Sequence, residues 1–122
     1  MPIFLKYGNI RGEAKEPAHR SWMELESASF SPHGSRAISE ISVSRRSDSA
    51  SIHLQQQAIG GAQVSAIIDF VRAQGGVYLR LELSGTMISS YSLSSDGDRP
   101  TEALTLNFSK MEYKPIPGTP AP

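Results

Sequence analysis

Strict alternation of apolar and polar residues in the stretch VYLRLEL, residues 77–83, constrains this chain more than any other feature. Alternation with a period of two places successive side chains on opposite faces of an extended strand. The inward face then carries Val77, Leu79, Leu81 and Leu83, and the outward face carries Tyr78, Arg80 and Glu82. The sequence AQGG directly before this stretch is typical of a hairpin turn, so the strand follows an antiparallel neighbour.

Similar patterns predict further strands in IFLKYGN, WMELESASF, AISEISVSR, TMISSYSL and LTLNFSKMEY. Residues 64–71 fit both a helical stripe and a strand, and their enrichment in Val and Ile favours a strand. In the last segment the apolar parity changes near Ser109–Lys110, which predicts an extra residue at a bulge.

One short helix is expected at about residues 50–59. Asp48 or Ser49 is expected to cap its start. Its apolar face, expected to dock on a sheet, carries Ile52, Leu54 and Ile59. Gly60 suits the left-handed turn that ends a helix. Seven or eight strands joined by sequential hairpins, with one helix, predict a mainly β protein. The expected fold is a small antiparallel β-barrel or sandwich.

Composition narrows the class of function. The 122 residues suffice for one domain with its own core, and the absence of cysteine excludes disulfides and thiolate chemistry. Twelve basic and twelve acidic side chains cancel, so we expect neither a nucleic-acid partner nor an anionic membrane partner.

No apolar run approaches the roughly 20 residues needed to cross a bilayer, so membrane insertion is not expected. The first residues lack a signal-peptide pattern, so any export is expected to need no signal peptide. Nineteen serines, many within alternating stretches, predict strands with one solvated face.

No pattern points to catalysis, a metal or a cofactor. Asp96, Asp98 and Glu102 lack the spacing of a calcium loop and are better explained by a strand-to-strand turn. His19, His33 and His53 lie far apart and are expected on the surface. The sequence has no nucleophile elbow, and the carboxylates of Glu24 and Glu26 on one strand face are an ordinary exposed pair. We therefore expect a protein that is not an enzyme.

Two stretches resemble the Hcp family, the haemolysin-coregulated proteins of bacterial type VI secretion. The first is IFLKYGNIRGEAKEPAH, with Gly8, Gly12-Glu13, Lys15 and His19 in order. The second begins at Asp98-Arg99-Pro100-Thr101-Glu102 and continues into ALTLNFSKMEYKP. The resemblance extends over about residues 2–115.

This resemblance implies a two-sheet antiparallel β-barrel over residues 1–115, with one helix on its side and a short proline-rich tail at 116–122. It also implies hexameric rings that stack into a hollow inner tube, driven by a sheath behind a spike, with effectors in the lumen. The family's ring-to-ring contact corresponds to Ser31, Pro32, His33, Gly34, Ser35 and Arg36. This loop is shorter and poorer in glycine than the family pattern, and the chain ends soon after its last strand, so stable stacking is put in doubt.

Ser27 and Ser29 match positions that face the lumen in the family, and ordinary exposed strand serines are the alternative. Trp22, Asp98, Arg99 and Glu102 are candidate residues of the contact between subunits. The alternatives are that Trp22 packs under its adjacent loop and that Arg99 pairs with an acidic neighbour within the chain. The resemblance implies location in the bacterial cytoplasm before secretion. A monomeric β-barrel binding module, or an accessory relative that forms no tube, is the alternative function.

Overall fold

The structure is a computed structural model that describes residues 2–30, 40–73, 75–95 and 98–116. The described residues form eight β-strands, one α-helix and one short 3-10 helix. In chain order these are β1 (Ile3–Tyr7), η1 (Pro17–His19), β2 (Met23–Leu25), β3 (Ser27–Ser29), β4 (Glu40–Arg46), α1 (Ser51–Gly60), β5 (Val64–Val71), β6 (Val77–Ser94), β7 (Thr101–Asn107) and β8 (Lys110–Pro115). The loop at 31–36 and the tail at 117–122 lie outside the described residues.

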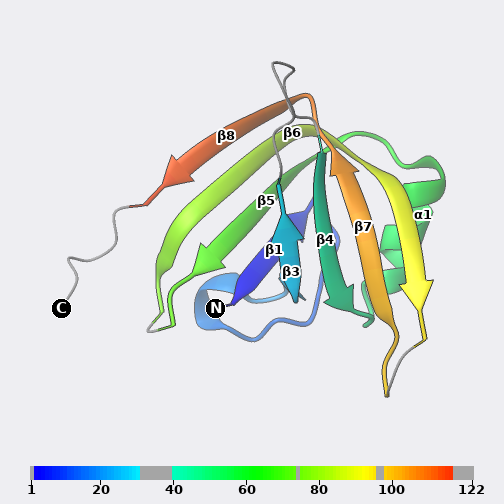
Figure 1. Cartoon of the computed structure of the whole chain (residues 1–122), viewed down its shortest axis with the longest axis horizontal. Coiled ribbons are helices and arrows are strands. Elements are labelled where there is room, and N and C mark those ends of the chain that lie inside the picture. The colour runs from blue at the N-terminus through cyan, green and yellow to red at the C-terminus, as the bar shows by residue number, and fades with distance from the viewer. Residues whose placement is uncertain (1, 31–39, 74, 96–97, 117–122) are drawn as a thin grey trace.

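All strand pairs are antiparallel and follow the order β2-β1-β5-β6-β7-β4-β3, with β8 paired to β6 beside this path (Figure 1). The expectation of a mainly β, antiparallel, two-sheet fold with one helix is confirmed. The hydrogen-bonded path has two ends, β2 and β3, so the strands alone do not close it into a barrel. These ends are consecutive in the chain and meet at Glu26, whose backbone N–H donates to the Ser44 carbonyl at 2.7 Å.

Strand β6 belongs to both sheets and changes direction at Gly85. The sequence predicted two strands here, whereas the structure has one of 18 residues. Its first half pairs with β5 and β8, and its second half pairs with β7. Gly85 has a φ of 61°, a left-handed conformation that glycine adopts without strain. The long strand therefore bends at a residue type that adopts this backbone without a side-chain clash.

The predicted change of parity near Ser109 is present, but it lies between strands β7 and β8, so the prediction of a bulge within one strand was wrong. In β7 the even-numbered positions face the core, as Leu104 and Leu106 show. In β8 an odd-numbered position, Met111, packs against the core. The Ser109 N–H donates to the Ser84 carbonyl at 2.9 Å, beside the bend of β6. The inward parity therefore changes between β7 and β8 beside the point where β6 bends.

The core lies between the inner faces of the two sheets and is almost entirely apolar. Its fully buried members include Leu5, Met23, Ile41, Leu54, Ile68, Leu83, Leu104 and Leu106. Burial of such side chains stabilises the fold by roughly 1.5–3 kcal/mol each. Residues 64–71 form strand β5, as their Val and Ile content predicts.

The helix contacts this core by a narrower face than expected. Leu54 is fully buried, but Ile52 is 54% exposed and Ile59 is 89% exposed, so the prediction that all three dock was wrong for two. Asp48 assists the helix start by accepting from the Ala50 N–H at 2.8 Å. Gly60 remains helical, and Gly61 follows with a φ of −75°, so no left-handed glycine ends this helix.

Residues 10–22 cover the outer face of β1. Phe4 points away from the core, yet it is only 3% exposed because the His19 ring stacks on it with centroids 4.6 Å apart. His19 itself is 2% exposed, so the prediction of a surface histidine was wrong. The sheet is therefore packed on both faces at this point.

Candidate functional site

His19 lies between two carboxylates on the outer face of the first sheet. Its Nδ1 is 2.8 Å from Glu16 Oε2, and its Nε2 is 2.8 Å from Asp69 Oδ2. Carboxylate oxygens only accept, so both contacts are hydrogen bonds when the imidazole carries two protons. Arg80 completes the cluster by donating from Nε and Nη2 to the two oxygens of Asp69 at 2.7 and 2.8 Å. The two negative charges of Glu16 and Asp69 are then balanced by the positive charges of His19 and Arg80. Charged groups are buried in proteins when they are paired in this way.

This cluster fixes the loop that precedes β2 onto the sheet. The hydrogen bond from His19 lowers the pKa of Glu16, and the hydrogen bond to Asp69 raises the pKa of Arg80. Trp22 meets the edge of the His19 ring, with centroids 4.7 Å apart. Trp22 is partly buried beside this ring, and its role at a subunit contact stays a prediction. The geometry indicates a structural cluster.

A second buried cluster joins strand β6, which belongs to both sheets, to helix α1. Arg45 Nη1 lies 2.5 Å from Glu102 Oε1, and its Nη2 lies 2.6 Å from Asp48 Oδ1. The Tyr91 hydroxyl donates to Glu102, and Gln55 Nε2 donates to the Tyr91 oxygen at 3.1 Å. Burial, and then the bond to Glu102, raises the pKa of Tyr91. Glu102 is fully buried, so its carboxylate does not reach another subunit, contrary to its predicted role at the subunit contact.

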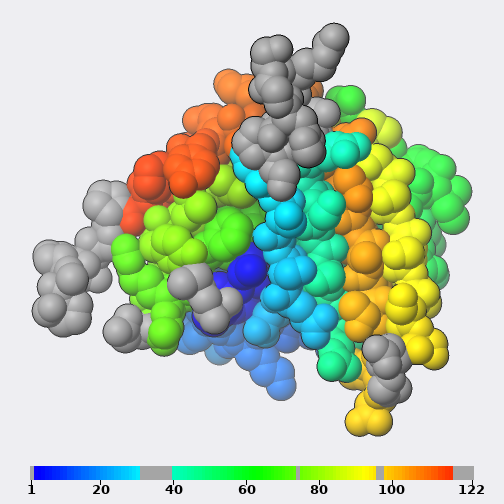
Figure 2. Space-filling view, viewed as in Figure 1, coloured from blue at the N-terminus to red at the C-terminus, as the bar shows by residue number. Residues whose placement is uncertain are grey.

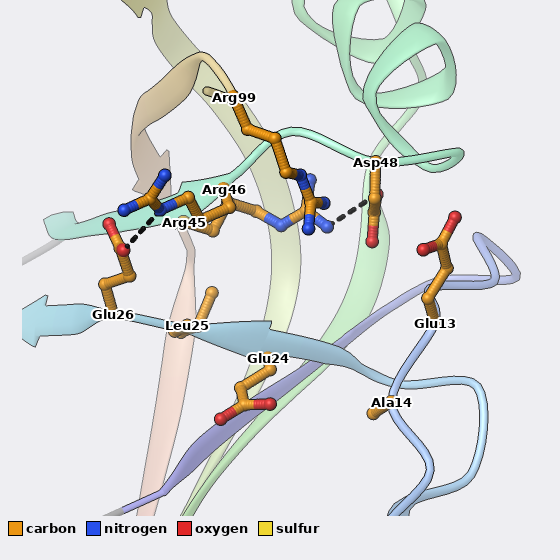
Figure 3. A pocket seen from close by; sticks show the side chains of 9 residues that line it. All are labelled: Glu13, Ala14, Glu24, Leu25, Glu26, Arg45, Arg46, Asp48 and Arg99. Carbon is orange, nitrogen blue, oxygen red and sulfur yellow. Dashed lines mark hydrogen bonds and ion pairs between the residues drawn. The ribbon is translucent and has the colours of Figure 1, made fainter. Parts of the chain in front are cut away.

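A charged cleft of about 530 Å³ opens beside this cluster (Figure 3). It is lined by Glu13, Ala14, Glu24, Leu25, Glu26, Arg45, Arg46, Asp48 and Arg99. Figure 3 shows Glu26 turned toward Arg46, whose Nε is 3.1 Å from Glu26 Oε2. Glu13 accepts from the Ser49 N–H at 3.0 Å, and hydrogen bonds from Ser49 lower its pKa. Many charged side chains that line the cleft are therefore paired with opposite charges of the same chain.

The other predicted contact residues lie near this cleft. Asp98 and Arg99 are exposed, and Arg99 donates to the Ser47 carbonyl of the same chain. This contact lies within the chain, but it is made to a backbone carbonyl and not to an acidic neighbour, so the ion pair predicted for Arg99 is not seen among the contacts of the described residues. Residues 96–97 and the predicted stacking loop fall outside the part that the structure describes. Within that part, no group of three or more His, Cys, Asp or Glu side chains could hold a metal ion. The described helix is also too short and polar to cross a membrane.

Ser27 and Ser29 belong to a wider uncharged surface on the second sheet. Both are exposed on β3, and the register places them opposite Ser44 and Ser42 of β4. The pairing continues through β7 to β6. We call this surface the hydroxyl face; its members are Ser27, Ser29, Ser42, Ser44, Ser90, Ser92, Ala103 and Thr105. Glu40 and Arg46 lie on the same face of β4 at its two ends, so the charges stand at the borders.

Exposed large apolar side chains of the described residues occur mainly at two places. At one, Ile59 of α1 and Leu93 of β6 line the same groove, whereas Ile52 and Met87 are exposed outside its lining. The other lies on β8 and beyond it and comprises Tyr113 and Ile116. Figure 2 shows β8 at the left and the end of β6 with α1 at the right of the same view. Contiguous exposed apolar surface marks sites of interaction.

Sequence reasoning missed these two surfaces, although a signal for the first was present. Residues 49–68 and 83–95 contain no Asp, Glu, Lys or Arg in a chain that is 20% charged. Those runs include α1 and the second half of β6. Between them lies a groove of about 480 Å³, lined by Gln55, Ala58, Ile59, Ser89, Ser90, Tyr91 and Leu93. Charge depletion over a groove is typical of the core of an interface.

Comparison with known proteins gives a consistent result. The sequence matches the family described as "Type VI secretion system effector, Hcp" over residues 4–114. The fold is similar to that of Hcp2 from Salmonella typhimurium, with 25% identity, a TM-score of 0.85, and coverage of 94% of this chain and 87% of the other. It is also similar to Hcp1 from Salmonella typhimurium, with 22% identity, a TM-score of 0.88, and coverage of 95% and 87%. No curated protein sequence matches the chain.

The fold also extends to a contractile injection system. A cryo-EM structure of the PVC sheath-tube complex in the extended state contains a chain with a TM-score of 0.67 and 10% identity. That match covers 93% of this chain and 88% of the other. At this identity the likeness concerns the fold alone.

Proposed function

Because this chain belongs to the Hcp family of type VI secretion proteins, we propose that it is a structural subunit of the secretion tube. The observation that carries the proposal is the family match over residues 4–114, which includes every strand from β1 to most of β8. In this role the chain does not catalyse a reaction. Copies assemble into hexameric rings, and the rings stack into a hollow tube that holds effectors.

Open strand edges support assembly between copies. Among the described residues, β8 pairs with β6 on one side only, and β3 pairs only with β4. Unpaired backbone groups along an edge are unfavourable unless solvent, another segment or another chain satisfies them. Contacts between different surfaces of identical copies close into a ring when the rotation between neighbours divides a full turn.

The hydroxyl face is suited to line the lumen. It presents small hydroxyl side chains and Ala103 and carries no charge. A lining that must hold varied effectors and release them benefits from weak, unspecific contacts, because tight pockets would retain the cargo. Ser27 and Ser29 are then lumen residues, whereas the outer face of the first sheet is covered by residues 10–22.

The remaining partners follow from the same proposal. Residues 31–36 form the contact between stacked rings, and Trp22, Asp98 and Arg99 are candidates for contacts at the ring surface. The sheath, the spike and effector proteins are the other partners. The chain is made in the bacterial cytoplasm and leaves the cell with the fired tube.

Native mass spectrometry near physiological salt, with negative-stain images, tests the proposal. The expected result is a dominant hexamer that appears as open rings. A monomer over a wide range of concentration would contradict the tube role and favour the alternative, a monomeric binding module with the same fold.

A further inference from the structure

The groove between α1 and β6 is bordered by apolar side chains that their own chain does not cover. Ile59 is 89% exposed at its rim, and Leu93 of β6 is half-exposed opposite. Tyr91 and Leu93 point to the inner side of the second sheet, since their β7 partners Leu104 and Glu102 are buried. The inner face of this sheet thus continues beyond the core and ends in an open groove.

A matching surface exists at the other end of the molecule. Tyr113 is 61% exposed, although its register partner Leu81 is buried in the core. Met111 and Tyr113 share the inner face of β8, and Ile116 continues the pairing with β6 by donating its N–H to the Tyr78 carbonyl at 2.9 Å. We call this surface, made of Met111, Tyr113 and Pro115, the β8 arm.

The distribution of charge makes the two surfaces compatible. The groove lining contains no charged side chain. On β8 the charged residues Lys110, Glu112 and Lys114 have the opposite parity, and Lys114 Nζ lies 3.1 Å from Glu82 Oε1 on the outer face. The cores of interfaces are depleted in charged residues and enriched in tyrosine and methionine. Neither surface would have to bury an unpaired charge against the other.

We propose that the groove of one copy receives the β8 arm of the next copy, with Tyr113 seated between α1 and β6. This inference rests on the proposed ring and names the contact that closes it. The two surfaces differ and lie at opposite ends of the view in Figure 2, so the contact is head-to-tail. An open edge of β8 also enters the contact, which removes an exposed strand edge.

Two variants test the groove and the β8 arm independently. Ile59→Glu places a charge in the groove, and Tyr113→Glu places a charge on the arm. Both side chains are largely exposed in the single chain, so each variant is expected to fold, which circular dichroism and thermal unfolding verify. Ile52→Glu, on the same helix but outside the groove lining, is the matched control and is expected to keep the ring.

The expected result is a monomer for each variant alone, because each contact weakens by about thirtyfold or more, as for loss of a hot-spot residue. A mixture of the two variants is expected to yield a one-to-one heterodimer, since one intact groove then meets one intact arm. No larger species is expected in the mixture, because the remaining groove and arm are both altered.

Native mass spectrometry of the two variants, the control and the mixture distinguishes the outcomes. Rings that persist in both variants would overturn this contact and leave the proposed tube role standing. Variants that become monomeric but do not pair when mixed would overturn the head-to-tail arrangement. A monomeric unaltered chain would overturn the ring itself, and with it this contact.

Discussion

Among the described residues, charged side chains are buried where their charges are balanced. His19 meets Glu16 and Asp69, and Arg80 offsets the second carboxylate. Arg45 contacts both Asp48 and Glu102. A buried ion without a partner is strongly unfavourable, so each cluster depends on all its members. These clusters hold loops to strands.

The pair formed by Arg45 and Glu102 gives the first prediction. Arg45→Met is expected to lower the free energy of unfolding by about 3–5 kcal/mol, because it leaves buried carboxylates without their cation. Glu102→Leu combined with Arg45→Met is expected to cost less than the sum of the single changes, by about 1–3 kcal/mol. Urea unfolding of the four proteins at one fixed concentration measures this coupling. Strictly additive costs would show that the two residues do not act as a pair.

The second prediction concerns Glu16 and acid pH. Its pKa is lowered from the model-compound value of 4.5 by the hydrogen bond from His19. A lowered folded-state pKa contributes stability above the unfolded-state pKa, and this contribution disappears as pH falls through the folded-state value. We therefore expect the free energy of unfolding to fall less between about pH 5 and about pH 3 in Glu16→Gln than in the unaltered chain. Urea titrations at each pH provide the measurement. Parallel pH profiles would mean that the Glu16–His19 contact is absent in solution.

At the scale of elements, the bend of β6 decides how the two sheets are joined. A continuous strand carries its pairing from β5 and β8 to β7 by changing direction at Gly85. The inward parity changes from odd at Leu83 to even at Ile88, and β7 and β8 make the matching change beside it. One strand can therefore contribute to the inner faces of both sheets.

Gly85→Ala is expected to destabilise the fold. The left-handed φ costs a side chain about 1–2 kcal/mol, and a Cβ would overlap Ser109 Oγ, which now donates to the Ser84 carbonyl at 3.1 Å. Loss of that bond adds about 1 kcal/mol. Gly60→Ala is the matched control, because its helical position has open space and gains about 0.5–1 kcal/mol. Thermal unfolding compares the two, and equal effects of the two changes would contradict the role of the bend.

Most strands could be predicted from the sequence because alternation records which side chains face the core. The same rule located the parity change near Ser109, whereas residues 64–71 fitted two periods and were assigned to a strand by their Val and Ile content. It failed where burial comes from a non-local partner. His19 is buried by Phe4 and Asp69, 15 and 50 positions away, and Glu102 is buried by Arg45. No local pattern reports such contacts, so both were placed on the surface.

The helix shows a second limit of sequence reasoning. Ile52, Leu54 and Ile59 are all apolar, and composition alone does not say which side meets the sheet. Only Leu54 does so within the described chain, which leaves Ile52 and Ile59 exposed. In the proposed ring, Ile59 acquires its partner from the next copy. The failed docking prediction and the groove are therefore two aspects of the same feature.

At the scale of the whole molecule, three surfaces made by the described residues differ in chemistry. The hydroxyl face is uncharged and polar, the groove and the β8 arm are uncharged and apolar, and the cleft in Figure 3 collects opposite charges. Two different contacts could in principle hold a ring together, one through the apolar surfaces and one through exposed charges such as Arg99 and Lys114. Their dependence on salt differs, because mobile ions screen exposed charges and leave apolar contact intact.

The proposed groove contact therefore predicts that rings resist salt. At about 0.1 M ionic strength the screening length is roughly 10 Å, and at about 1 M it is roughly 3 Å, so a contact held by exposed ion pairs would weaken strongly. We expect the monomer–hexamer equilibrium to shift by less than about threefold in subunit affinity over this range, and ammonium sulfate to favour the ring. Sedimentation velocity at dilute concentrations measures the equilibrium, with Tyr113→Glu as the monomeric reference. Rings that dissociate in 1 M sodium chloride would assign the contact to the charged surfaces instead of the apolar groove.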